Sequence, residues 1–188
     1  MRMITIWGFV LLLAGVALSA CGPADEAVAP VTYTAYTNAA TGLTFAYPET
    51  WAISETGEGQ ITIASNQEVI DEEAYTGGSV VNIFVGPADL FGEDLVAALN
   101  ELVGLMVENE STTIIREAAA TTIQGQEAAS VTLAGREGNR EVTLEAAIVR
   151  GESALAFMAA IYENDDAAAD APIISHIVNS MTLQPVQE

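Results

Sequence analysis

The sequence predicts an α+β fold in which a largely antiparallel sheet carries helices on both faces. Three observations predict it: short strand-like segments separated by turn residues fill residues 31–85, two later segments have helical periodicity, and residues 154–162 are apolar on both sides. A strand with two apolar faces has to be covered twice. The two helices are therefore expected to lie on opposite faces of one sheet.

Strands are expected in the first half of the domain. Apolar residues between turn residues predict them at residues 31–37, 43–47, 51–54, 60–64 and 79–85. Glycine and asparagine at residues 38–42, 57–59 and 77–78 mark the chain reversals.

Residues 89–109 then change to the period of a helix. At about 100° per residue, one broad face collects Phe91, Leu95, Ala98, Leu99, Leu102, Leu105 and Met106. The other face carries Glu93, Asp94, Ala97, Asn100 and Glu101. This amphipathic helix is expected to lie on the sheet with the first set buried.

Three more strands are predicted at residues 112–123, 127–134 and 140–150, followed by the doubly apolar strand at 154–162. A closing helix is predicted at residues 172–183, with Pro172 near its first turn. One arc of that helix is apolar and is expected to cover the second face of the sheet: Ile173, Ile174, Ile177, Val178 and Met181.

Cys21 is the only cysteine of the chain. Before it lie Arg2, an apolar run over residues 4–18 and small residues at a cleavage point, which are the parts of a secretory signal peptide. The run is shorter than the roughly 20 residues that cross a bilayer. An ordinary secretory signal with a chance cysteine, or a buried structural thiol, is the alternative to a role for Cys21.

Residues 18–21, Leu-Ser-Ala-Cys, resemble the lipobox of bacterial lipoproteins. The resemblance implies that the Cys21 sulfur receives a diacylglycerol, that the chain is cleaved before it, and that the new amine is acylated. More than one acyl chain is what stable membrane anchoring requires. Residues 1–20 are then a signal peptide, 21–32 a lipidated tether with two prolines, and 33–185 one folded domain on the extracytoplasmic side of the cell membrane.

The chain is strongly acidic, with 26 Asp and Glu against five Arg, no Lys, and a formal net charge of −21. Nucleic-acid binding is excluded because it relies on clustered basic residues. An acidic surface is also repelled by anionic lipid head groups. The lipid anchor at Cys21, and not the protein surface, is therefore expected to hold the domain at the membrane.

No catalytic residues are predicted. The single histidine, His176, falls on the polar side of the closing helix and is expected to face solvent, and no nucleophile elbow or H-E-x-x-H motif occurs. Arg136 and Arg140 flank a loop and either capture an anionic ligand or are screened by Glu137 and Glu141. The expected protein is thus not an enzyme and needs no cofactor.

Two acidic clusters are candidates for a weak calcium or manganese site, because carboxylate oxygens are the ligands of hard cations. They consist of Asp71, Glu72 and Glu73, and of Asp165, Asp166 and Asp170. Neither has the spacing of an EF-hand loop. Solvated loop acids are the alternative, with Asp165 and Asp166 favouring the positive end of the closing helix.

Residues 42–51, G-L-T-F-A-Y-P-E-T-W, resemble the opening hairpin of the PsbP-like family, G-(aliphatic)-[ST]-F-x-Y-P-x-x-W, and residues 125–129 resemble its G-x-x-A strand start more loosely. The resemblance implies an α/β/α sandwich without catalytic residues. Members include extrinsic photosystem II subunits, a small-GTPase-binding protein and bacterial lipoproteins of unknown role. This chain lacks the lysine-rich docking surface of the photosystem subunits, so none of their binding residues transfers.

Together these features predict a non-enzymatic, membrane-anchored extracytoplasmic lipoprotein that binds a partner protein through an edge or loop of the sandwich. The alternative is an extracytoplasmic receptor for a cation, calcium or manganese, or for a small solute.

Overall fold

The computed structural model describes residues 30–56, 59–72, 75–107 and 112–185. The chain from Val31 onward forms a compact unit of its own. The signal peptide, Cys21, nearly all of the tether and Glu73 lie outside the described residues, as do the side chains of Glu72 and Met106. Within the described residues, no helix is both long enough and apolar enough to cross a membrane.

Ten strands, three α-helices and one 3-10 turn follow one another in the described part of the chain. Their order is β1 Tyr33–Asn38, β2 Leu43–Pro48, β3 Ala52–Thr56, β4 Gln60–Ala64, α1 Gln67–Glu72, β5 Val80–Pro87, α2 Leu95–Val107, β6 Thr113–Ile123, β7 Gln126–Glu137, β8 Arg140–Arg150, β9 Ala154–Glu163, the 3-10 turn Asn164–Asp166, α3 Ala167–Ser180 and β10 Thr182–Leu183.

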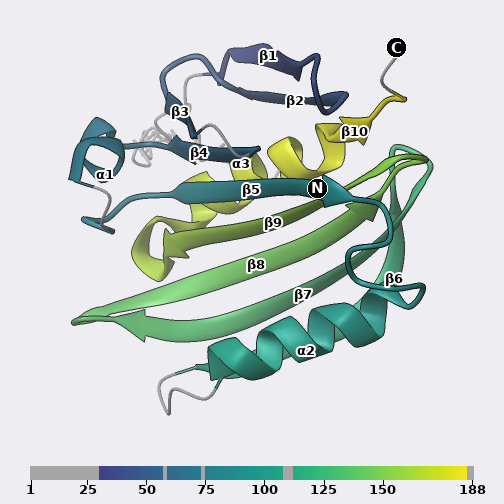
Figure 1. Ribbon diagram of the computed structural model, residues 1–188. Coiled ribbons are helices and arrows are strands. Elements are labelled where there is room, and N and C mark those ends of the chain that lie inside the picture. The colour runs from purple at the N-terminus through teal and green to yellow at the C-terminus, as the bar shows by residue number, and fades with distance from the viewer. Residues whose placement is uncertain (1–29, 57–58, 73–74, 108–111, 186–188) are drawn as a thin grey trace, which may run out of the picture. The chain divides into compact units, whose positions relative to one another are not determined.

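Seven strands form one sheet in the order β3-β4-β5-β9-β8-β7-β6, and β1-β2-β10 form a small second sheet. All strand pairs are antiparallel. Figure 1 shows α3 and the small sheet on one side of the large sheet and α2 on the other. The predicted α+β sandwich, with a largely antiparallel sheet between helices, is confirmed.

Alternation along β9 explains why helices are needed on both faces. Met158 and Tyr162 point into the core formed with α3 and the small sheet, where Ile174 and Ile177 are fully buried. Leu155, on the opposite face, packs with the helix α2 through Leu99. The sequence pattern of two apolar faces is thus satisfied by two separate cores.

The opening hairpin shows why its motif begins with glycine. Gly42 has a φ of +70°, and a Cβ there would collide with the carbonyl oxygen of Gln184, which follows β10. The amide of Gln184 in turn donates to the Gly42 carbonyl at 2.9 Å. Phe45 and Trp51 are buried in the core. These motif residues therefore shape the hairpin and fill the core.

Helix α2 begins at Leu95, later than the predicted residue 89, because Asp94 caps it: the amides of Val96 and Ala97 donate to its Oδ1 at 3.0 Å. Leu95, Leu99 and their neighbours are buried as predicted, but Leu105 is 67% exposed. The prediction for Leu105 was wrong because the sheet covers a narrower arc of the helix than the apolar residues occupy.

Helix α3 begins at Ala167, before the predicted residue 172, so Pro172 lies inside it. The alanines that precede Pro172 are strong helix formers, and Pro172 itself is exposed, where its missing amide hydrogen leaves no buried carbonyl unpaired. The predicted helix was to end at Leu183, but α3 ends at Ser180. Leu183 instead pairs with Leu43 in the small sheet. Other strand ends shift by a few residues, and the sequence did not predict α1.

Tyr162 makes stability sensitive to alkaline pH. Burial, reinforced by the carboxylate of Glu145 that accepts its hydroxyl hydrogen at 3.1 Å, raises its pKa from 10.0 to about 12, and burial and Glu163 raise the pKa of Tyr75 to about 12. Both phenols therefore stay protonated up to a higher pH in the folded chain than in the unfolded chain. The stabilisation is therefore complete below about pH 10 and is lost as the pH rises towards 12.

Urea unfolding at a series of pH values measures this loss of stability. The double variant Tyr75→Phe with Tyr162→Phe is expected to lose less stability than the wild type between pH 10 and pH 12, the unfolded and folded values of these groups. An identical decline in both proteins would contradict the assignment.

Candidate functional site

The described acidic residues that were predicted to bind a metal lie on different elements and do not form a common site. Asp71 lies on α1 and accepts a hydrogen bond from Gln67 Nε2 at 3.0 Å, whereas Asp165 and Asp166 are exposed in the 3-10 turn. Asp170, on α3, accepts a hydrogen bond from the hydroxyl of the fully buried Ser79 at 2.7 Å. Among the described residues, no three His, Cys, Asp or Glu side chains come together as a metal site. Asp170 thus has a structural partner that its sequence position did not indicate.

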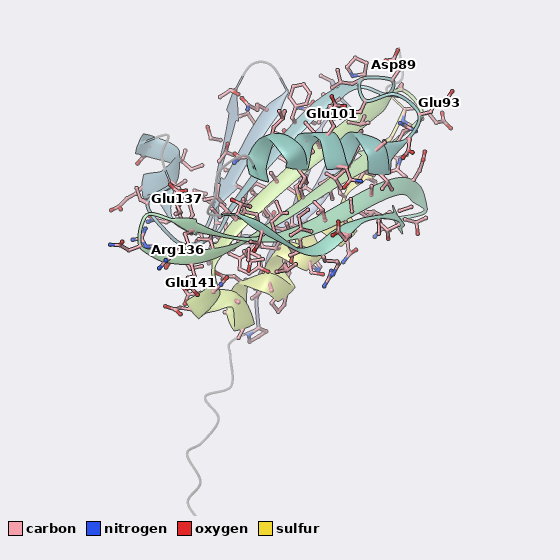
Figure 2. The ribbon with its side chains drawn as sticks, turned by 90° about the horizontal axis from the view of Figure 1, so that it is seen from below. Asp89, Glu93, Glu101, Arg136, Glu137 and Glu141 are labelled. Atoms are coloured by element: carbon pink, nitrogen blue, oxygen red, sulfur yellow. The ribbon has the colours of Figure 1, made fainter. Side chains whose placement is uncertain are left out.

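His176 is exposed on α3, as predicted, and its ring lies 3.8 Å from that of Tyr33 between centroids. Arg136, Glu137 and Glu141 lie at the β7–β8 hairpin, at the opposite end of the sheet from Glu93 (Figure 2). Arg140, also in this hairpin, makes an ion pair with Glu163 at 3.3 Å.

Arg150 holds the loop that leads into α2. Its guanidinium donates to the carbonyl of Glu93 at 2.9 Å and to the carbonyl of Gly92, and pairs with Glu127 of β7 at 3.0 Å. The side chain is only 18% exposed. Arg150 therefore fixes the start of α2 against the sheet, next to the strand pair β6–β7.

Strand β6 is the most exposed long element of the domain. It ends the order of the seven-stranded sheet, β7 is its one partner among the described strands, and nine of its eleven residues are exposed. Ile114 and Ile115 are 39% and 61% exposed. Its only charged residues are Arg116 and Glu117, whose opposite charges give the strand no net charge. A sheet edge of this length and neutrality is ready to pair with another strand.

The two halves of β6 differ. Register shifts at Ile114/Arg116 and at Arg116/Ala119 interrupt the first half, and such bulges blunt an edge against pairing. From Ala119 to Ile123 the register is regular, and this part contains neither a charge nor a proline. The second half of β6 is therefore the part of the edge best suited to accept a further strand.

An acidic hollow of about 320 Å³ lies beside this half, on the face of the sheet that carries α2. Ala120 lines it together with the three carboxylate residues Glu93, Asp94 and Glu127, of which Glu127 is paired with Arg150. On the other face, Thr121 lines a smaller hollow that also contains Arg116 and Glu145. The surroundings of the edge are thus acidic on the α2 side and mixed on the other.

The sequence predicted a strand at residues 112–123 but not its place at the edge. Its alternation is weak, with Ala118, Ala119 and Ala120 in a row. A run of small residues without a clear buried face is the available signal for a strand that stays largely exposed at the edge of the sheet. The acidic hollow could not be found this way, because its residues come from three separate elements.

No family model matches the chain, and a search of curated protein sequences finds no match. Solved structures are similar in fold. The solution structure of the cyanobacterial PsbP, CyanoP, from Synechocystis sp. PCC 6803 superimposes with a TM-score of 0.59 at 14% identity, over 89% of this chain and 99% of CyanoP. LpqN of Mycobacterium tuberculosis, described as involved in cell envelope biogenesis, gives 0.55 at 12% identity over 83% of this chain and 86% of LpqN.

A protein of Bacteroides thetaiotaomicron gives a TM-score of 0.52 at 17% identity, over 82% of this chain and 49% of that one. At such identities the likeness concerns the fold alone. The domain has a PsbP-like fold, as the hairpin motif implied.

Proposed function

We propose that this chain is a non-enzymatic accessory protein of the cell envelope, tethered to the membrane through acylated Cys21, which binds an extended segment of a partner protein along β6. The observation that carries the binding role is the regular, uncharged half of this edge strand, residues 119–123, which pairs on one side only. Strand addition to an open edge takes its affinity from backbone hydrogen bonds and its specificity from the pockets beside the edge.

The acidic hollow beside β6 supports a basic partner segment. Glu93, Asp94 and Glu127 lie next to Ala120, so basic side chains on one face of the added strand find opposite charges there. A second copy of this chain suits the edge less well, because each copy has a formal charge of −21 and the two repel each other. The proposed partner segment is therefore extended and basic.

The signal-like N-terminus and the proteins that share the fold support the proposed location in the cell envelope. CyanoP is a PsbP protein, and LpqN is described as involved in cell envelope biogenesis. These similarities support an accessory role outside the cytoplasm.

A charge series at Ala120 tests the partner site. The acylated chain carries a photoreactive residue in place of Thr122, is crosslinked in membranes, and the amount of partner recovered is compared between variants. Ala120→Lys is expected to reduce recovery by about threefold or more, since it places a positive charge against a basic strand, whereas Ala120→Glu retains recovery or raises it.

The matched control is Ala35→Lys, which places the same charge at an exposed alanine of β1, the edge strand of the small sheet. It is expected to recover as much partner as the wild type. Equal recovery with Ala120→Lys and Ala120→Glu would refute a basic partner at this edge. Crosslinks only to a second copy of the chain would replace the proposal with self-association.

A further inference from the structure

A second hollow, of about 360 Å³, lies on the sheet face that α1 and α2 share. Strands β3, β4 and β5 form its floor, and Ile70 of α1, Tyr75 and Ile161 of β9 also line it. Its volume is within the range of small-molecule sites, about 300–1,000 Å³. Neither β6 nor the acidic hollow contributes a residue to it.

Polar side chains form a row across the floor of this hollow. Cross-strand pairing places Ser54 opposite Thr62 and Thr62 opposite Asn82, so that three hydroxyl or amide side chains form a row across three strands. On the next row of the same face, Gln60 lies opposite Thr56. A sheet face that a helix covers is normally apolar, as it is beneath α2. Within the described residues, this row of uncharged polar groups stays partly or fully exposed.

Hydrogen bonds within the sheet orient some of these polar side chains. The Thr62 hydroxyl donates to Asn82 Oδ1 at 2.8 Å, and the Thr56 hydroxyl donates to Gln60 Oε1 at 3.4 Å. Both carboxamides therefore use their oxygen within the sheet and keep the NH₂ group as the donor for a further molecule. The Tyr75 hydroxyl donates to the carbonyl of Gly78 at 2.8 Å, which holds the ring at the wall.

The charge of the residues around this hollow indicates which class of ligand it can bind. Among the described residues, those that line this hollow include no acidic or basic side chain, although the chain carries a formal net charge of −21. A protein of this net charge repels an anion, and the described part of the lining offers a cation no carboxylate. Amide and hydroxyl groups beside Ile70, Ile161 and Tyr75 suit a neutral molecule with hydroxyl groups on its rim and apolar C–H groups on its faces.

We propose that this hollow binds a neutral saccharide, with Asn82 and Gln60 donating hydrogen bonds to its oxygen atoms and Tyr75, Ile70 and Ile161 contacting its apolar face. The site is separate from the β6 edge and does not depend on the proposed partner binding.

Saturation-transfer NMR on the full acylated chain in a sugar-free detergent tests the site, with N,N′-diacetylchitobiose and maltose as probes. At least one of the two sugars is expected to show transfer at millimolar concentration. Asn82→Leu is expected to weaken its binding by about tenfold or more, because a sugar oxygen loses its hydrogen-bond donor and meets an apolar side chain instead. Gln60→Leu, at an exposed position, gives a second variant should Asn82→Leu fail to fold.

The chain contains a matched control. Thr143 donates to Asn164 Oδ1 at 2.8 Å, the same pair of side chains at the same distance but outside the hollow. Asn164→Leu is expected to leave sugar binding unchanged, as is Ala120→Lys in β6. Absence of transfer to both sugars, or equal binding by Asn82→Leu and the wild type, would overturn the proposal. Equally strong binding of glucuronate would contradict the selectivity for neutral molecules.

Discussion

Leu99→Ala is expected to lower the free energy of unfolding by about 2–5 kcal/mol, because it leaves a cavity between α2 and the sheet. Leu99 is fully buried and belongs to the core that α2 forms with Val131, Leu133 and Leu155. Urea unfolding followed by circular dichroism gives the free energy of each variant.

The same helix contains the control for this experiment. Leu105 has the same side chain but is 67% exposed, so Leu105→Ala is expected to change the free energy of unfolding by no more than about 0.5 kcal/mol. Comparable losses in the two variants would mean that α2 is rotated, with Leu105 on the sheet.

Cys21→Ser is expected to release the chain from the membrane into the soluble fraction. The acyl chains on Cys21 are the only proposed attachment, and an acidic surface has no attraction of its own for anionic head groups. Fractionation of cells and immunodetection measure the distribution. Mass spectrometry of the wild-type N-terminus is expected to find an acylated Cys21 as the first residue.

Ala20→Gly keeps a small residue before the cysteine and is the control, expected to stay at the membrane. A Cys21→Ser variant that has lost residues 1–20 and still remains membrane-bound after a salt wash would show that something other than this sulfur holds the chain there. The described residues of the β6 edge at Ala120 and of the hollow at Asn82 do not include Cys21, so the anchor, the partner site and the sugar site can each be refuted separately.

Local patterns in the sequence were sufficient for most elements. The strands at residues 60–64 and 140–150 have the predicted bounds. Errors arose where a tertiary contact ends an element: the predicted helix ran to Leu183, but Leu183 pairs with Leu43 and so belongs to the small sheet. Helix α1 was missed because it has six residues, too few for a helical period to show.

The candidate sites were harder to predict than the fold. The acidic residues stand out in the sequence, yet Asp170 accepts a hydrogen bond from Ser79, which lies 91 residues away along the chain. Ala120, Asn82 and Gln60 have no distinctive sequence signal at all. They become candidates only because of what surrounds them in space.

The sequence by itself determined the alternation of strands and helices, the two apolar faces of residues 154–162 and the acidic, lysine-free composition, because each is a property of neighbouring residues or of the whole count. Only the tertiary structure decided that β6 lies at the edge of the sheet and that Asn82 lies exposed on the sheet face that carries α1 and α2. Strand order and helix position depend on pairings between distant segments, such as β5 with β9, and no local pattern encodes which pairing prevails.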